Sequence, residues 1–368
     1  MKNWNFLCLV SLVVVFMGAL QACSSDESEE DDESDVSDYI ALLTHQFDEV
    51  LIPTMESYQT EITNFENTLI SVASTIDEAT LATLRQHFES AYLAYQSAAV
   101  HDYFSTSTVD LVELTNLYPI EISTLDELIT SESRAFEDIS HARANGFPAI
   151  DYMLYGPDDV LTYLNEDTKR IDFLKALISD MKSRSDELIT QWNNLREPFI
   201  SSDGTGLGSA ISSQLNGSLS YYEFTVREDK VGIPIGRVGP NDSPIDPDAT
   251  KIEAYYHSLA SGNEDFTLLL VQTAVEEMED IYLGSTSSGT DGQGYDDLLA
   301  AREQTAIDSD IKAQFATIYA EIGSRGSINS EDNNAVLYNA IQGLVTLYKS
   351  DLFPILNIQD ADGANDGD

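Results

Sequence analysis

Residues 146–156 read Gly-Phe-Pro-Ala-Ile-Asp-Tyr-Met-Leu-Tyr-Gly, and they predict one short helix with sharply defined ends. Asn145-Gly146 is typical of a stop to the preceding helix, Pro148 favours a new start, and Gly156-Pro157 ends it. Isolated helices of this length are marginal in water. We therefore expect this helix to present side chains for function and to add little to the scaffold.

The helical spacing divides the side chains of this segment between two faces. One face is apolar, with Ile150, Met153 and Leu154, and the other carries Pro148, Asp151, Tyr152 and Tyr155. Asp151 is a candidate for metal ligation or acid–base chemistry. The alternative interpretation is structural, because an acid in the first turn favours the helix dipole by about 0.3–1 kcal/mol.

From Tyr39 onward, apolar residues recur at three- and four-residue spacings, which predicts helices. Leu84, Phe88, Tyr92 and Tyr95 form one such stripe. The predicted helical segments are 40–58, 81–103, 111–128, 171–192, 250–259, 265–282, 308–322 and 335–347. Strand patterns are nearly absent. The prediction is an all-α protein of helical bundles with two halves, 39–200 and 201–358, divided near residues 198–208.

The first residues have the composition of a targeting segment. Lys2 precedes an apolar run that is shorter than the roughly 20 residues needed to span a bilayer, so residues 1–22 are interpreted as a signal peptide. Leu20-Gln21-Ala22-Cys23 resembles a bacterial lipobox, which predicts a lipid on Cys23. The alternative is an ordinary secretory signal with an incidental cysteine. Cys8 leaves with the signal, so disulfides and thiolate sites are excluded from the mature domain.

The chain is strongly acidic, with 18 basic and 64 acidic residues and a net charge of −46. This charge argues against nucleic acid as a partner, because phosphate binding needs clustered lysine and arginine. It also argues against electrostatic adhesion of the protein to anionic lipids. The lipid predicted on Cys23 is therefore the expected link to the membrane. Residues 23–38 are interpreted as an acidic disordered tether and residues 359–368 as an acidic tail.

Three of the few basic residues fall close together, at Arg227, Lys230 and Arg237, in a segment predicted to be a glycine- and proline-rich loop. Such clustering in a negative field favours a site for an anion or carboxylate. The alternative is that these cations neutralise neighbouring acids and fix the loop to the bundle. The five histidines show no His-Glu-x-x-His pair, and no phosphate-binding or dinucleotide-binding motif is present.

Four segments, taken together and in order, resemble the imelysin-like family, also classed as M75 peptidases, and in particular its lipoprotein members from Bacteroidetes. The segments are 84–104, 146–156, 227–234 and 351–356 with the Asp-Gly-Asp ending. The resemblance implies two similar bundle-like halves with a site at their interface. The family signature is Gly-x-His-x-x-Glu. Here Gly146 is kept, Pro148 stands in place of the histidine, and Asp151 replaces the glutamate.

This resemblance implies a binding protein linked to iron or haem acquisition, because proline cannot ligate and a zinc peptidase needs about three protein ligands. Iron or haem is the expected ligand, and iron- or haem-uptake components are expected partners. The expected site residues are Gly146, Asp151, Tyr152, Tyr155, Arg227 and Lys230, with Asp151 as metal ligand. The expected location is the outer membrane, facing the periplasm or the cell surface. The alternatives are an M75-type metallopeptidase and a surface adaptor.

Overall fold

The computed structural model describes residues 39–72, 75–103, 111–202, 204–239, 244–261, 266–286, 288–328 and 331–361. These residues form helices and turns and no strand, so the all-α prediction is confirmed. The predicted signal peptide, Cys23 and the acidic tether lie outside the described residues, as does the tail after residue 361. None of the helices described has the length and apolar character of a membrane span.

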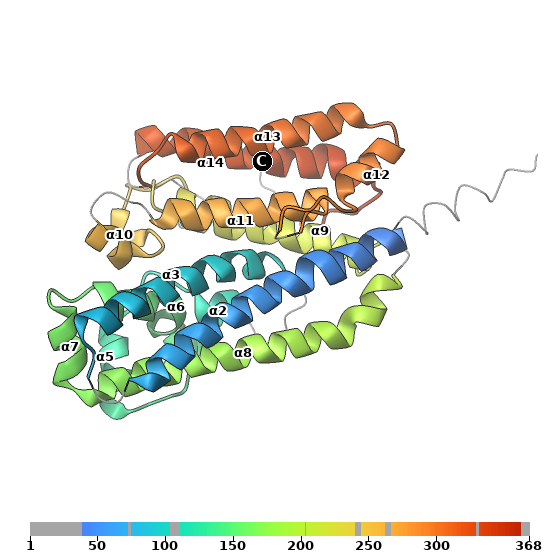
Figure 1. Cartoon of the computed structure of the whole chain (residues 1–368). Helices are drawn as coiled ribbons and strands as arrows, with labels where there is room; N and C mark the ends of the chain where they lie inside the picture. The colour runs from blue at the N-terminus through green and yellow to red at the C-terminus, as the bar shows by residue number, and fades with distance from the viewer. Residues whose placement is uncertain are drawn as a thin grey trace, which may run out of the picture.

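The helices lie in two layers (Figure 1). The first layer contains three long helices, α2 (Ile52–Ser71), α3 (Glu78–Val100) and α8 (Thr168–Ile200), and α2 packs against both of the others. Shorter elements complete this layer: η1 (Gln46–Leu51), α4 (Leu111–Thr115), α5 (Ile122–Ser131), η2 (Ile139–Ala144), α6 (Gly146–Tyr155) and α7 (Val160–Glu166). Aspartates cap several of these helices; Asp77 and Asp159, for example, accept backbone N–H groups at the starts of α3 and α7.

The second layer is formed by residues after the end of α8. Its main helices are α11 (Phe266–Leu283), α13 (Thr305–Gly323) and α14 (Glu331–Leu347). The others are α9 (Ala210–Ser220), η3 (Tyr221–Gly232), η5 (Ala249–Lys251), α10 (Tyr255–Ser261), α12 (Tyr295–Ala301), η6 (Tyr348–Leu352) and α15 (Phe353–Ile355). The exact division into halves at residues 200 and 201 stays a prediction.

The two layers share one hydrophobic core, with α3 packed against α11. The predicted stripe of Leu84, Phe88, Tyr92 and Tyr95 is fully buried. The rings of Tyr92 and Phe147 stack in parallel with centroids 4.2 Å apart, so α3 is tied directly to α6. This contact places the short motif helix against the centre of the molecule.

Three local predictions were wrong. Residues 250–259 are not one helix, because η5 ends at Lys251 and α10 begins only at Tyr255. Residues 111–128 are not one helix, because α4 ends at Thr115 and Pro119, which has no backbone N–H, lies in the connection before α5. Residues 227–232 are helical and not a loop, because η3 continues α9 with π-type hydrogen bonds as far as Gly232. The irregular segment that the glycines and prolines predict begins only after Gly232.

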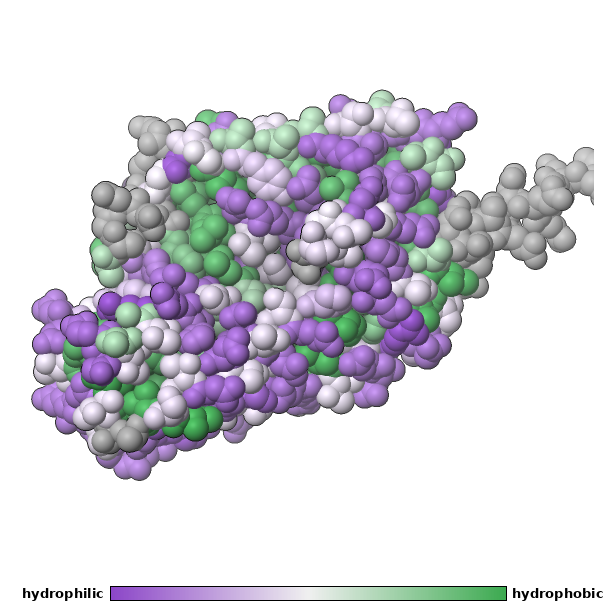
Figure 2. Space-filling view, in the orientation of Figure 1, coloured by the Kyte–Doolittle hydropathy of each residue, from purple (hydrophilic) through white to green (hydrophobic). Residues whose placement is uncertain are grey.

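The surface is mixed in polarity (Figure 2). An apolar area is visible over the start of α11, next to α10. Leu259 of α10 is 60% exposed and Leu269 of α11 is 43% exposed. Single exposed leucines are common on protein surfaces.

Candidate functional site

Helix α6 is held in place at both of its ends. At its start, the Asn145 amide oxygen accepts the Gly146 N–H at 2.8 Å, and the Asn145 amide nitrogen donates to the Phe136 carbonyl. Gly146 has a φ of +59°, and a Cβ there would overlap the carbonyl oxygen of Thr115. At the other end, the Arg85 guanidinium donates two hydrogen bonds to the Leu154 carbonyl. A glycine is therefore required at position 146 for packing as well as for backbone conformation.

The predicted polar face of α6 is divided in the structure. Pro148 and Asp151 are buried, whereas Tyr152 and Tyr155 are half-buried. Only the first pair lines the pocket described below. The predicted polar face therefore does not act as one surface.

Both carboxylate oxygens of Asp151 bind the backbone of α10. Oδ2 accepts the Tyr256 N–H at 2.9 Å and Oδ1 accepts the His257 N–H at 2.8 Å. Asp151 therefore caps a helix of the other layer. The side chain is 2% exposed. Burial raises the pKa of Asp151 to about 7, and this effect outweighs the two N–H groups, which lower it.

A pocket of about 450 Å³ lies in front of Asp151, between the two layers. The first layer contributes Tyr118, Pro119, Ile120, Pro148 and Asp151, and the second contributes Thr250, Ile252, Ala254, Tyr255 and Tyr256. Aromatic and aliphatic side chains thus form most of its wall. Asp151 supplies its one carboxylate.

A buried polar network lies directly behind this pocket. Glu253 stands between the pocket residues Ile252 and Ala254, and its carboxylate pairs with the Lys230 ammonium. Both side chains are completely buried. Burial lowers the pKa of Lys230, although Glu253 acts in the opposite direction.

The first layer completes the hydrogen bonding of this ion pair. The Gln96 amide donates to Glu253 at 2.9 Å and its oxygen accepts from Lys230 at 2.8 Å. The Asn116 amide donates to the same Glu253 oxygen at 2.6 Å, and Tyr92 donates to Asn116. The network joins α3 and the end of α4 to the second layer.

The other predicted site residues do not line the pocket. The Arg227 guanidinium binds Glu223 and Glu228 of its own helix and Gln342 of α14. These contacts match the alternative in which the cation neutralises neighbouring acids. Lys230 points into the buried network behind the pocket wall.

The two phenols of α6 lie to the side of the pocket. Tyr152 packs edge-on against Tyr256 with ring centroids 5.1 Å apart. The Tyr155 ring lies 4.8 Å from the His257 ring, and its hydroxyl donates to Glu89 at 3.3 Å. Both phenols therefore pack against α10 and are not directed at a common ligand position.

The residues present do not fit a protein-bound metal ion. Pro148 carries no donor atom, and both oxygens of Asp151 already accept backbone N–H groups. In the described residues, no three histidine, cysteine, aspartate or glutamate side chains are grouped as a metal site requires.

Sequence reasoning missed several residues of this region. Glu253, Gln96 and Asn116 meet Lys230 across long separations in the chain, and no local pattern marks them. The π-helical stretch that carries Lys230 is a rare conformation that is frequent at functional sites. Its sequence has no feature that would have predicted it.

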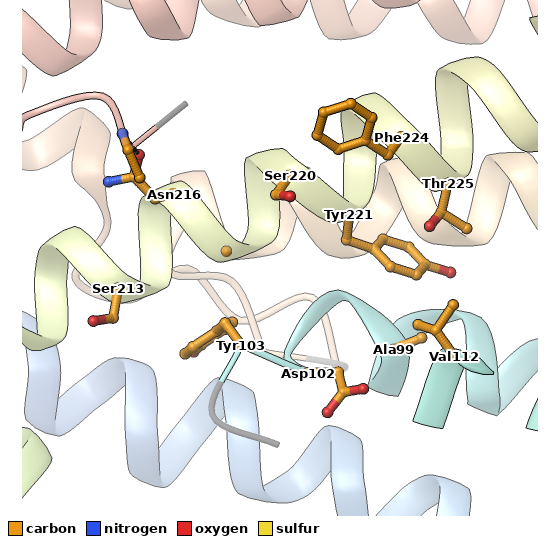
Figure 3. A pocket seen from close by; sticks show the side chains of 12 residues that line it. Ala99, Asp102, Tyr103, Val112, Ser213, Asn216, Ser220, Tyr221, Phe224 and Thr225 are labelled. Atoms are coloured by element: carbon orange, nitrogen blue, oxygen red, sulfur yellow. Dashed lines mark hydrogen bonds between the residues drawn. The ribbon is translucent and has the colours of Figure 1, made fainter. Parts of the chain in front are cut away.

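A second cavity of about 440 Å³ lies between the end of α3 and the α9–η3 helix (Figure 3). Its lining residues are Ala99, Asp102, Tyr103, Val112, Ser213, Asn216, Gly217, Ser220, Tyr221, Phe224, Thr225 and Ala361. Several of its polar groups are already bound within the protein. Asn216 accepts the Ala361 N–H, and the Tyr221 hydroxyl donates to Gln96.

Comparisons with known proteins agree with this architecture. An imelysin-like protein from Psychrobacter arcticum matches with a TM-score of 0.70 and 16% identity, over 89% of this chain and 98% of that one. A protein named as an iron-regulated protein A precursor, from Parabacteroides distasonis, matches with a TM-score of 0.69 and 16% identity, over 91% and 96%. No curated protein matches the sequence. The imelysin family model, Peptidase_M75, matches residues 51–360, and the chain therefore belongs to the imelysin family.

Proposed function

We propose that this imelysin-family chain is a lipid-anchored binding protein that binds an organic ligand in the pocket between its two layers. This binding contributes to the acquisition of iron or haem. The observation that carries the proposal is the pocket of about 450 Å³, to which both layers contribute walls. Binding pockets for small molecules are mostly apolar, contain a few polar groups, and occur preferentially at interfaces of this kind.

The pocket chemistry favours an organic ligand over a bare ion. Tyr118, Tyr255 and Tyr256 offer ring surfaces, and the prolines and isoleucines offer apolar contact. Asp151 and Thr250 provide polar groups. Iron would therefore enter as part of a preformed complex or of haem, as cargo, with its ligands supplied mainly by the complex itself. The name of the Parabacteroides neighbour, which refers to regulation by iron, supports this context for that protein.

The proposed membrane link is a lipid on Cys23. The segment from Cys23 to Asp38 has 16 residues. We propose an outer-membrane location, facing the periplasm or the cell surface.

Titration of the protein with haem and with ferric citrate, followed by visible absorbance and intrinsic fluorescence, tests the ligand. We expect saturable binding at micromolar concentration and a loss of at least tenfold in affinity on Tyr255→Ala. The matched control is Phe224→Ala, an aromatic residue of the second cavity, which should bind normally. Unchanged spectra with both compounds would rule out iron or haem cargo.

The name of the matching family model, Peptidase_M75, favours a peptidase as a second candidate function. That activity predicts peptide cleavage that a chelator abolishes. The buried environment of Asp151, with both oxygens on backbone N–H groups, does not offer the open metal position that such a mechanism needs. Chelator-sensitive cleavage by a preparation free of other proteases would support the peptidase and argue against a purely binding role.

A further inference from the structure

The pocket between the two layers is lined by three tyrosine rings. Tyr118 comes from the first layer, and Tyr255 and Tyr256 come from the start of α10 in the second. The rings of Tyr255 and Tyr256 meet edge to face, with centroids 5.0 Å apart and planes at 72°. Rings at a steep angle to each other can form adjacent sides of a box, and aromatic boxes of this kind bind organic ammonium ions through the negative faces of the rings.

Asp151 places a carboxylate at this pocket without a cation beside it. The side chain is 2% exposed, and in the described part of the chain no lysine, arginine or histidine forms an ion pair with it. The two backbone N–H groups that it accepts occupy two of the roughly four acceptor positions of a carboxylate. They do not supply a full positive charge, so this buried carboxylate gains from a cation in the pocket.

The walls of the pocket offer no positive charge of their own. Among the described residues, those that line it include no lysine, arginine or histidine. Three basic residues lie behind or beside it, and each is bound to other groups of the protein. These contacts join Lys230 to Glu253, Lys251 to Asp248 at 3.9 Å, and Arg143 to the backbone carbonyls of Tyr118 and Pro119.

This set of groups favours one class of ligand. A carboxylate or phosphate group in the pocket would meet the Asp151 carboxylate and no lining cation, so its charge would be repelled. A metal ion needs several oxygen or nitrogen ligands. An organic ammonium ion needs only charge and contact surface, and the tyrosine rings together with Asp151 provide both.

We propose that the pocket selects an organic cation, whose ammonium group lies between the tyrosine rings of the wall and the Asp151 carboxylate. The inference deepens the proposed function and rests on it, because it takes this pocket as the ligand site. Among iron complexes, one that carries an ammonium group would bind more tightly than an anionic one of similar size. The net charge of −46 acts in the same direction, since a strongly negative field raises the local concentration of cations.

The test uses three compounds of nearly the same shape that differ in charge. They are choline, which is positive, 3,3-dimethylbutan-1-ol, which is neutral, and 3,3-dimethylbutanoate, which is negative. Calorimetric titration of the full chain at constant ionic strength measures the three affinities. We expect choline to bind at millimolar concentration or below, at least about tenfold more tightly than the alcohol, and the carboxylate to bind most weakly.

Variants locate the cation within the molecule. Tyr255→Phe keeps the ring and should keep the preference for choline, whereas Tyr255→Leu should remove most of it. Asp151→Asn removes the charge and should lower the affinity for choline more than the affinity for the alcohol. Phe224→Leu, in the second cavity, is the matched control and should bind choline as the unmodified protein does.

Each result decides a separate point. Equal affinities for choline and the alcohol, or no binding of choline to the unmodified protein, would overturn the selection for a cation, and this series needs no variant to fold. A preference for choline that survives both Tyr255→Leu and Asp151→Asn would overturn the assignment to this pocket. If choline binds as expected but haem and ferric citrate do not, the proposed cargo fails and the cation site stands. If haem or ferric citrate binds and choline does not, the cation site fails and the cargo stands.

Discussion

Lys230 and Glu253 form a completely buried ion pair at the contact between the two helical layers, and every hydrogen-bonding partner around it comes from a different part of the chain. Gln96 of α3 contacts both members of the pair. The pocket residues Ile252 and Ala254 flank Glu253 in sequence. The ion pair therefore fixes one wall of the pocket relative to the first layer.

Removal of one member of this pair should destabilise the protein strongly. Lys230→Met leaves the Glu253 carboxylate buried and unpaired, which costs about 3–5 kcal/mol. Urea denaturation measures the free energy of unfolding. Lys251→Met, at a lysine that is partly exposed and lies 3.9 Å from Asp248, is the control and should change stability by less than about 1 kcal/mol. The double variant Lys230→Met with Glu253→Leu should recover part of the loss; no recovery would contradict the buried-charge explanation.

Stability should fall as the pH rises through neutrality, and Asp280 should contribute to this fall. Burial, followed by the like charges of Glu277, Glu279 and Glu276, raises the pKa of Asp280 from 3.8 to about 8. The folded state therefore binds more protons than the unfolded state between these values. The resulting stabilisation is complete below about pH 4 and is lost as the pH rises through 8.

Asp280→Asn should make the thermal midpoint less dependent on pH between 5 and 8.5 and should raise it at the upper end. Asp310→Asn, an exposed change on α13, is the control for removing a negative charge. Differential scanning calorimetry at several pH values checks the prediction. Equal pH slopes for Asp280→Asn and the unmodified protein would contradict it.

Gly146→Ala should disrupt the start of α6. The left-handed backbone at position 146 costs alanine about 1–2 kcal/mol, and the overlap with the Thr115 carbonyl adds to this. The shift should extend to the pocket, because Pro148 and Asp151 follow in the same helix. Gly323→Ala, at a glycine with open space around its α-carbon and within helix α13, should be neutral or slightly stabilising. Thermal unfolding of the two variants in parallel provides the measurement.

Pro148→His restores the histidine of the family signature, and we expect it not to create a tight metal site. Asp151 keeps both oxygens on the α10 backbone, and no third donor is grouped with it in the described residues. Calorimetric titration with zinc and with ferrous iron should show no stoichiometric binding at micromolar concentration. Stoichiometric binding would show that Asp151 can leave α10 to ligate.

Much of the fold could be predicted from local patterns, since those patterns act within one or two turns. Asn145 and Gly156 mark the ends of α6, and the buried stripe on α3 has the expected spacing. The apolar period over residues 111–128 predicts one helix, but Pro119 lies between α4 and α5, and a proline does not supply the N–H that a continuous helix needs. The sequence did not decide the role of Asp151. It was compatible with a metal ligand and with an acid that stabilises its own helix.

The sequence alone determined an all-helical chain and a short motif helix with fixed ends, with Pro148 and Asp151 in it. Only the tertiary structure decided what Asp151 binds, where Lys230 lies, and which phenols face the pocket. The physical reason is distance along the chain. The N–H groups that Asp151 accepts are 105 and 106 residues away, and Gln96 is 134 residues from Lys230. Contacts of that kind form only when two separate layers bury each other's polar groups and each group must find a partner.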